Sequence, residues 1–275
     1  MNIEQDFITA CNEGNLKLAQ EILQNNPKIN IFAQNNSAFQ ISCENGHLHV
    51  AQWLLKVNPL IINFIDEITF QMACEYGYLK MAQWLLKVKP NINISDDNEY
   101  SFRLACAQNH FIVALWLLQI KPDIDISAKD EEAFSWTCLN GNLQLAQYLL
   151  NIKPDINISE NNNIAFKLAC SKGHLRVAQW LYTLLGKQTI DIFNDPEADD
   201  AFVWACEGKH LKVAQWLQTL KPFKYIIKTK NNNLISWNIN TDCKESLLFI
   251  LYSLTFKNYT NSLTPNLVTN FAKYI

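Results

Sequence analysis

The sequence predicts an all-α solenoid of seven helix-turn-helix units, because three residue types recur along it at a nearly constant interval. Seven of the eight cysteines are separated by successive gaps of 32, 31, 32, 32, 32 and 36 residues. Five of the seven glycines and six of the eight prolines keep the same interval. Such a period is typical of repeat proteins, whose units stack on their neighbours. The recurring cysteines are Cys11, Cys43, Cys74, Cys106, Cys138, Cys170 and Cys206.

Each unit reads as two short helices. In the first helix of the second unit, Phe39, Ser42 and Cys43 have the i, i+3, i+4 spacing of one helical face. Gly46 closes that helix, because a cap of this kind needs a positive φ that glycine adopts without strain. The second helix ends before Pro59, since proline disfavours helix in the residue that precedes it. The units begin near residues 7, 38, 69, 101, 133, 165 and 201.

The segments that join the units alternate polar and apolar residues with a period of two. Residues 91–95, 123–127 and 155–159 have this strand-like pattern, and turn-forming residues follow each of them. We therefore expect hairpin-like fingers between the helix pairs.

With this unit and this period the chain resembles the ankyrin repeat family over about residues 7–230. The core pattern Ala-Cys-x-x-Gly-His-Leu, as at 169–175, carries the resemblance, whereas Ala-Phe replaces the family's usual Thr-Pro-Leu-His opening in four units. The abundant asparagine and isoleucine also resemble the ankyrin repeat proteins of large DNA viruses of amoebae. The family resemblance implies a scaffold that binds other proteins.

The periodicity divides the chain into three parts. We expect a repeat stack over residues 1–233, and a degenerate eighth repeat or capping helix over 234–256, where Trp237 keeps the period and Leu247–Leu251 stands in for a second helix. Residues 257–275 form a tail without usable periodicity.

Composition argues against several function classes. The net charge of −3 gives no basic field for nucleic acid. The first six residues lack a signal-peptide pattern, and the longest strongly apolar run, Leu247–Leu251, is far shorter than the roughly 20 residues that span a bilayer. We expect an intracellular, cytoplasmic monomer, in the host cytoplasm if the chain is viral.

No residue pattern predicts an enzyme, a cofactor or a metal site. The cysteines read as small buried thiols, and a ladder of histidines one whole repeat apart cannot converge on one ion. Five tryptophans also recur with the repeat, and this ladder favours packing over base stacking: Trp53, Trp84, Trp116, Trp180 and Trp216. The lysines before proline favour helix ends over a basic stripe: Lys89, Lys121, Lys153 and Lys221. Glu131–Glu132 and Asp199–Asp200 read as solvated turns.

The predicted binding residues are those that the repeat leaves variable, at the ends of the first helices and at the finger tips. Tyr76 and Leu139 are the expected anchors, because aromatic groups dominate binding energy and Leu139 is apolar at a solvent-facing place. An alternative is a substrate-recruiting adaptor, for example for a ubiquitin ligase, that docks through the C-terminal segment; no clear F-box pattern is visible there. The predicted binding residues are Glu44, Asn45, Glu75, Tyr76, Asp97, Asn98, Gln108, Lys129, Asp130, Leu139, Asn140, Asn161, Asn162, Ser171 and Lys172.

Overall fold

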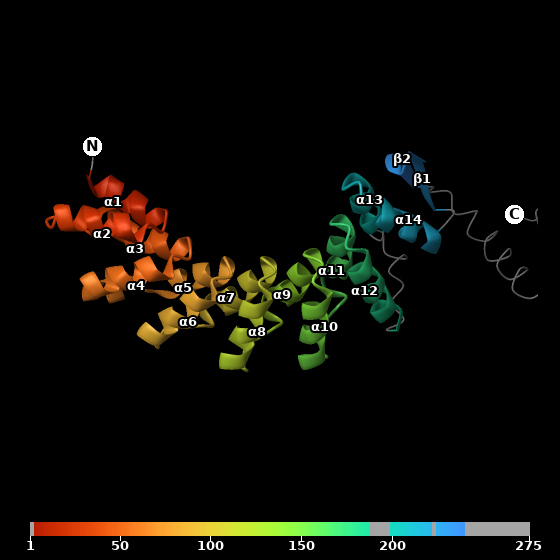
Figure 1. The fold of residues 1–275 in the computed structure, drawn as a ribbon. Coiled ribbons are helices and arrows are strands. Elements are labelled where there is room, and N and C mark those ends of the chain that lie inside the picture. Colours follow the sequence, from red (N-terminus) through yellow and green to blue (C-terminus); the bar gives the residue numbers. More distant parts are fainter. Residues whose placement is uncertain (1–2, 188–198, 222–223, 240–275) are drawn as a thin grey trace, which may run out of the picture. The chain divides into compact units, whose positions relative to one another are not determined.

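The computed structural model describes residues 3–187, 199–221 and 224–239, and helices account for most of them (Figure 1). The chain divides into two compact units, Met1–Ala165 and Phe166–Ile275, and the division falls inside helix α11 (Glu160–Ser171). The prediction was an all-α repeat protein; the described residues are mostly helical, and a small antiparallel hairpin departs from it.

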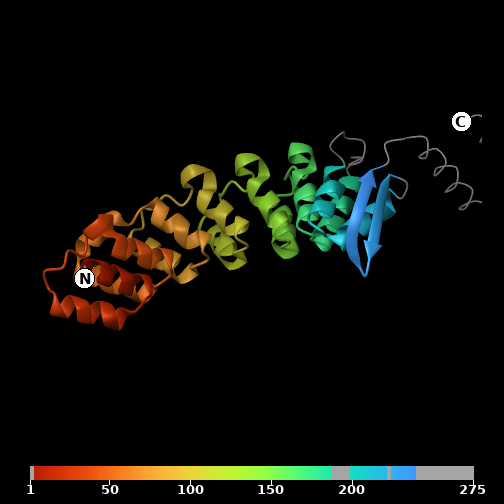
Figure 2. The same cartoon turned by 90° about the horizontal axis from the view of Figure 1, so that it is seen from above.

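In Met1–Ala165 the helices alternate between first and second members of a pair. Each first helix packs against the first helix of the next pair, and Figures 1 and 2 show this row. The first helices are α1 (Ile3–Asn12), α3 (Ala33–Glu44), α5 (Glu67–Glu75), α7 (Asp96–Ala107) and α9 (Ala128–Leu139). The second helices are α2 (Leu16–Asn25), α4 (Leu48–Val57), α6 (Leu79–Val88), α8 (Phe111–Ile120) and α10 (Leu143–Ile152), and a 3-10 helix, η1 (Pro59–Phe64), precedes α5.

The turn inside each pair is closed by a residue with a positive φ. Gly46 and Gly77 have φ values of 71° and 74°, and Asn109 takes the same conformation with φ 63°. Glycine has a second reason to be there, since a Cβ atom on Gly77 would lie 2.4 Å from Nδ1 of His110 in the next pair. Opposite Asn109, the next pair has the smaller Asn142, whose Nδ2 donates to Oδ1 of Asn109 at 2.8 Å.

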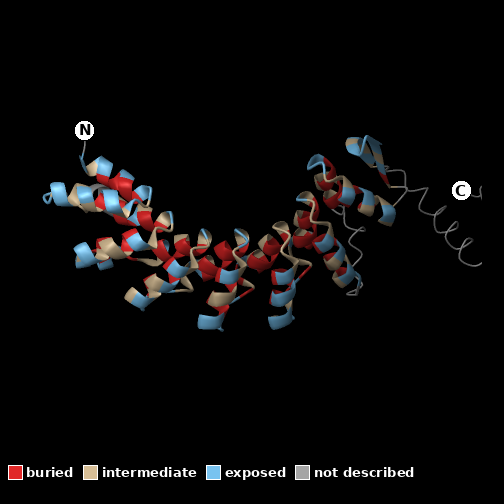
Figure 3. Ribbon diagram, in the orientation of Figure 1, coloured by how far each residue is buried: buried red, intermediate tan, exposed pale blue. Residues whose placement is uncertain are grey.

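The core of Met1–Ala165 lies where neighbouring pairs meet, as the buried residues in Figure 3 show. A phenylalanine in each first helix is almost fully buried, and in α1, α3 and α5 it faces the tryptophan of the following pair. The Phe70 and Trp116 ring centroids are 6.2 Å apart, and those of Phe39 and Trp84 are 6.5 Å apart. Such aromatic pairs contribute about 0.5–1.5 kcal/mol beyond their buried area. These tryptophans therefore serve packing between neighbouring repeats, as the sequence predicts.

The seven cysteines of the ladder are all buried and free, which confirms that they are packing residues. Burial raises the pKa of Cys11 and of Cys106 to about 12. At neutral pH these thiols are protonated, and a protonated thiol is neither a nucleophile nor a metal ligand.

The prediction of strand-like fingers is wrong, because residues 91–95, 123–127 and 155–159 form turns. Their polar residues bond to the local backbone: the amide of Ser95 donates to Oδ1 of Asn93 at 3.2 Å, and the amide of Ser127 donates to Oδ1 of Asp125 at 3.1 Å. A side chain that satisfies its own backbone competes with pairing to a strand. The alternating isoleucines still point inward, since Ile124 and Ile126 are both buried.

Phe166–Ile275 continues the pairs and then changes to a β-hairpin. Its elements after α11 are α12 (Leu175–Lys187), α13 (Asp200–Glu207), α14 (Leu211–Leu220), β1 (Tyr225–Lys230) and β2 (Asn233–Ile239). The strands are antiparallel, and Asn231 and Asn232 form the two-residue loop with positive φ values that such a hairpin needs.

The hairpin corrects the prediction for the C-terminal cap. Residues 234–239 form strand β2 and not the first helix of an eighth repeat, because β1 pairs with them. Tyr225 is fully buried and stacks on Phe202 with ring centroids 4.2 Å apart, and the ring of Trp237 meets the ring of Phe202 edge-on. Trp237 keeps the repeat period but lies on a strand. Residues 240–275, which include Leu247–Leu251 and the predicted tail, lie outside the described residues.

Candidate functional site

The first helices of Met1–Ala165 present the variable residues of the repeat in one row at their C-terminal ends. Tyr76 is 46% exposed at the end of α5, and Asn45 and Gln108 are exposed at the corresponding places after α3 and α7. Glu44, Glu75 and Leu139 are partly exposed. Because successive first helices pack side by side, the structure brings these residues together along the row.

Two of the predicted contact residues also have a structural role. The side-chain amide of Asn45 donates to the carbonyl of Ile41 at 2.8 Å and to Oδ1 of Asn12 at 3.1 Å. The amide of Asn140 donates to the carbonyl oxygens of Ala107 and Cys106 in the preceding pair. These bonds tie neighbouring turns to each other.

Ser171 and Lys172 belong to Phe166–Ile275, at the end of α11. Lys172 is exposed and Ser171 is partly exposed, with its hydroxyl donating to the carbonyl of Leu168 at 2.8 Å.

The predicted finger-tip residues lie in the first turn of the first helices, where the backbone is left-handed. Asp97 and Asn98 have φ values of 49° and 57°, and Lys129 and Asp130 have values of 57° and 58°. All four side chains are exposed. Asn161 is exposed as well, with φ 47°, and the side chain of Asn162 lies outside the described residues.

An arginine holds the first of these turns in place. The Nε and Nη2 groups of Arg103 donate to the carbonyl oxygens of Asn98 at 2.8 Å and Asp97 at 2.9 Å, and its Nη1 group forms an ion pair with Glu132. A left-handed turn of residues with side chains is costly, at roughly 1–2 kcal/mol per residue, so bonds of this kind are needed to keep it. The exposed tip at Asp97 and Asn98 therefore stands on a fixed backbone.

A ladder of glutamates, which the sequence reasoning missed, links three consecutive first helices, α5, α7 and α9, to the joining segments that follow them. Glu67 accepts from the amide of Asn93 at 3.1 Å, Glu99 from that of Asp125 at 3.4 Å, and Glu131 from that of Asn157 at 3.2 Å. Ser95 and Ser127 donate their hydroxyls to Glu99 and Glu131. Their spacing of 32 residues was a signal available in the sequence.

The glutamate ladder and two ion pairs correct the prediction of solvated turns. Glu131 is buried, and Glu132 pairs with the buried Arg103. Asp200 pairs with the buried Lys167 at 3.3 Å, and Asp199 accepts from the hydroxyl of Tyr225 at 2.9 Å. These carboxylates stabilise the stack, so they are not free to serve a site.

The lysines before proline bond to the joining segments. Nζ of Lys89 donates to the carbonyl of Ile65, Lys121 pairs with Asp123 at 2.9 Å, and Lys153 pairs with Asp125 at 3.3 Å. These bonds fit the structural interpretation of the lysines better than a basic stripe.

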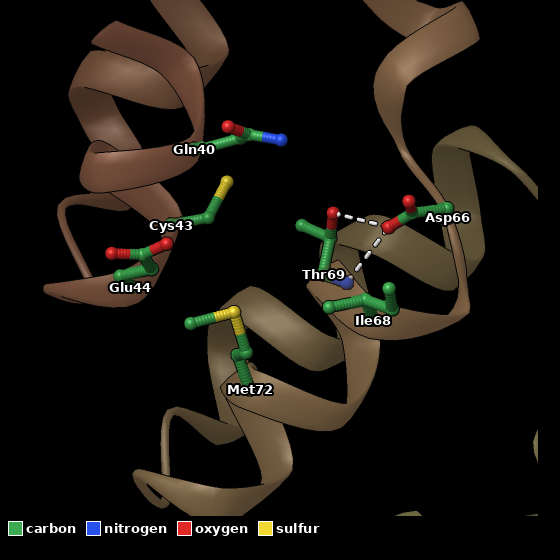
Figure 4. Close-up of a pocket in the computed structure, with 7 residues that line it drawn as sticks. All are labelled: Gln40, Cys43, Glu44, Asp66, Ile68, Thr69 and Met72. Carbon is green, nitrogen blue, oxygen red and sulfur yellow. Dashed lines mark hydrogen bonds between the residues drawn. The ribbon is translucent and has the colours of Figure 1, made fainter. Parts of the chain in front are cut away.

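A groove lies between the neighbouring first helices α3 and α5, with a volume of about 130 Å³. Figure 4 shows its lining: residues of α3 on one wall, and residues of α5 with its N-cap residue Asp66 on the other. Asp66 accepts from the amide and the hydroxyl of Thr69, at 2.9 and 2.7 Å, and so starts α5. We call this the α3/α5 groove, and its lining residues are Gln40, Cys43, Glu44, Asp66, Ile68, Thr69 and Met72.

In the described residues, no group of three or more histidine, cysteine or acidic side chains is placed to hold a metal ion. The thiol of Cys43 on the groove wall is buried, and burial raises its pKa above the ordinary range of a thiol. The groove offers a ligand apolar contact, hydrogen bonds and the carboxylates of Glu44 and Asp66.

Stacked helix pairs joined by capped turns, with variable side chains at their ends, define the repeat-protein class. A family model described as ankyrin repeats (3 copies) matches residues 7–98, 102–192 and 134–224, so the chain belongs to the ankyrin repeat family. Ankyrin repeats are generally modules for interactions between proteins. No curated protein matches the sequence. None of the helices in the described part of the chain is long and apolar enough to cross a membrane.

Proposed function

We propose that this chain is a non-catalytic scaffold that binds a partner protein on the ends of its first helices and on the exposed turns at their start. We also propose seven repeat units within residues 1–233, followed by the C-terminal segment. The observation that carries the proposal is a contrast within the repeat between positions that hold the backbone and positions whose residue varies. Structural bonds hold the backbone, and the side chains that differ from unit to unit point outward.

Rigid presentation supports the binding role. Arg103 and the glutamate ladder fix the turns, and Asn45 and Asn140 fix the helix ends, so little conformational entropy is lost when a partner binds. Tyr76 offers a large, half-exposed aromatic group of the kind that anchors interfaces.

The alternative is an adaptor that recruits a substrate and docks onto other machinery through residues 234–275. Most of that segment lies outside the described residues. We further propose an intracellular, cytoplasmic monomer without nucleic-acid binding, in the host cytoplasm if the viral resemblance holds.

The proposal is tested by replacing the two expected anchors with alanine in the full chain. Affinity purification followed by mass spectrometry identifies the partner, and calorimetry measures its binding. Tyr76→Ala and Leu139→Ala should each weaken binding about tenfold or more, because anchor residues carry about 1.4 kcal/mol or more. Circular dichroism should show unchanged helical content.

Tyr148→Ala is the matched control, because Tyr148 is 39% exposed but lies on the second helix α10. Equal losses from Tyr76→Ala and Tyr148→Ala would contradict the proposed surface. A partner lost only on deletion of residues 240–275 would favour the adaptor.

A further inference from the structure

One first helix differs from its neighbours in the side chains that it exposes. On α5, Ile68 and Met72, together with Tyr76 just after its end, have i, i+4, i+8 spacing and therefore share one helical face. Ile68 is 63% exposed and Tyr76 is 46% exposed, while Met72 is partly exposed. Apolar groups left in water along one face are a feature of binding surfaces.

The repeat itself does not require this apolar face. The corresponding places are Gln5, Thr9 and Glu13 for α1, Ser37, Ile41 and Asn45 for α3, and Tyr100, Leu104 and Gln108 for α7. For α9 they are Glu132, Trp136 and Asn140. Among α1, α3, α5, α7 and α9, α5 is thus the one with apolar residues at all three places.

The apolar face of α5 forms one wall of the α3/α5 groove. In Figure 4, Ile68 and Met72 lie on that wall, and Gln40, Cys43 and Glu44 lie on the wall formed by α3. Its volume of about 130 Å³ is close to that of a cavity that holds a benzene ring, about 150 Å³. The groove therefore has room for a single amino-acid side chain.

The charged residues around the α3/α5 groove indicate what kind of side chain it can bind. Helices α1, α3 and α5 contain no lysine or arginine, and Glu44 and Asp66 line the groove. The nearest lysines lie on other elements: Lys56 is on α4, Lys28 follows α2, and Lys89 follows α6 and bonds to the carbonyl of Ile65 beside Asp66. A groove lined by both apolar and acidic side chains complements a basic group on an apolar stem.

Glu44 gives an independent reason to expect a positive partner. It is the last residue of α3, where the backbone carbonyl groups already carry partial negative charge and a carboxylate is unfavourable. Glu75 stands at the same place on α5. Within the part of the chain that the structure describes, neither carboxylate forms an ion pair.

We propose that the α3/α5 groove binds a basic side chain from a partner protein, whose neighbouring apolar residues cover Ile68 and Tyr76. The aliphatic stem of the arginine or lysine lies against Ile68 and Met72, and its charged head reaches Glu44. The inference rests on the proposed function and adds the chemistry of the partner segment.

The test selects ligands without assuming a sequence. A displayed library of random 12-residue peptides is selected on the immobilised full chain, and one enriched peptide is then titrated by fluorescence anisotropy. Enriched peptides should be positively charged and should pair arginine or lysine with apolar residues. The dissociation constant should rise about fivefold for Glu44→Gln and about tenfold for Ile68→Asn.

Two matched variants control for charge and for exposed apolar area outside the groove. Glu21→Gln removes an exposed carboxylate from α2, and Ile112→Asn removes an isoleucine on α8 that is 60% exposed. Both should leave the dissociation constant within about twofold of the unsubstituted chain, since neither lines the groove. Glu44→Gln should not lower the melting temperature, because it removes an unfavourable charge from a helix end.

Other outcomes overturn the inference. Neutral or acidic peptides, or basic peptides whose binding ignores Glu44→Gln and Ile68→Asn, would show that the groove does not select a basic group, while leaving the scaffold proposal standing. Dimerisation that Ile68→Asn abolishes would make a second copy of the chain the occupant. Recovery of no binding peptide would count against both the groove and the scaffold.

Discussion

At the scale of single residues, the chain buries thiols and charged groups whose reactivity is lowered by burial or by pairing. The cysteines recur where a small side chain must fit between helices, and burial raises the pKa of each of the seven. Arg103 and Lys167 are buried charges, and each is paired with a carboxylate. A buried charge without a partner would be strongly destabilising, so these residues belong to the fold.

The raised thiol pKa values predict a loss of stability at alkaline pH. A group whose pKa is higher in the folded state contributes stability that is full below its unfolded pKa, here 9.0, and is lost as pH rises toward the folded value. For Cys106 that window is about pH 9 to 12. Each such thiol should lower the free energy of unfolding by about 1.4 kcal/mol per pH unit within it.

Urea unfolding of the native chain and of Cys106→Ala, at several pH values from 8 to 11, checks this. The alanine variant loses one titrating thiol, so its free energy of unfolding should fall less steeply above pH 9. Parallel curves for the two proteins would show that Cys106 ionises as easily in the folded chain as in the unfolded one.

At the scale of elements, residues in neighbouring pairs are matched to each other. The positive-φ residue that ends a first helix faces the residue that precedes the second helix of the next pair. The two residues are in contact, so the size of one limits the size of the other. Where the first is Gly77, the second is His110; where the first is Asn109, the second is Asn142. The turn therefore works as a pair of residues from adjacent units.

A double-mutant cycle tests this matching. Asn142→His should lower the free energy of unfolding by about 1–3 kcal/mol, because the imidazole would meet the side chain of Asn109 as it would meet a Cβ atom on Gly77. Adding Asn109→Gly should recover the part of the loss that the clash causes, since it recreates the native pair Gly77 and His110, but not the cap bond that Asn142 accepts from the amide of Leu145 at 3.0 Å. Additive effects of the two substitutions, measured by urea unfolding, would mean that the residues are independent.

At the scale of the whole molecule, periodic residues were the most predictable part. The period of the cysteines and the spacing of Phe39, Ser42 and Cys43 are local, so the helix pairs and the tryptophan packing follow from them. The joining segments were mispredicted, because Asn93 and Asp125 bond to their own backbone and override the strand-like alternation.

The features that the sequence did not predict depend on contacts between neighbouring repeats, which the sequence pattern does not show. Glu131 reads as a solvated turn residue until its bond to Asn157 in the next joining segment is seen. Trp237 keeps the period of the repeat, yet pairing with β1 places it on a strand. The α3/α5 groove needs two helices from different units, so no single segment predicts it.

The central claim is that partner binding occurs on the first-helix ends and the turns that precede them. Hydrogen exchange of the full chain, with and without the partner identified by affinity purification, tests it most directly. Binding should slow amide exchange around the C-terminal ends of α3, α5, α7 and α9 and in the left-handed turns at Asp97 and Lys129. Protection confined to the outer second helices, such as α8 and α10, would contradict the claim.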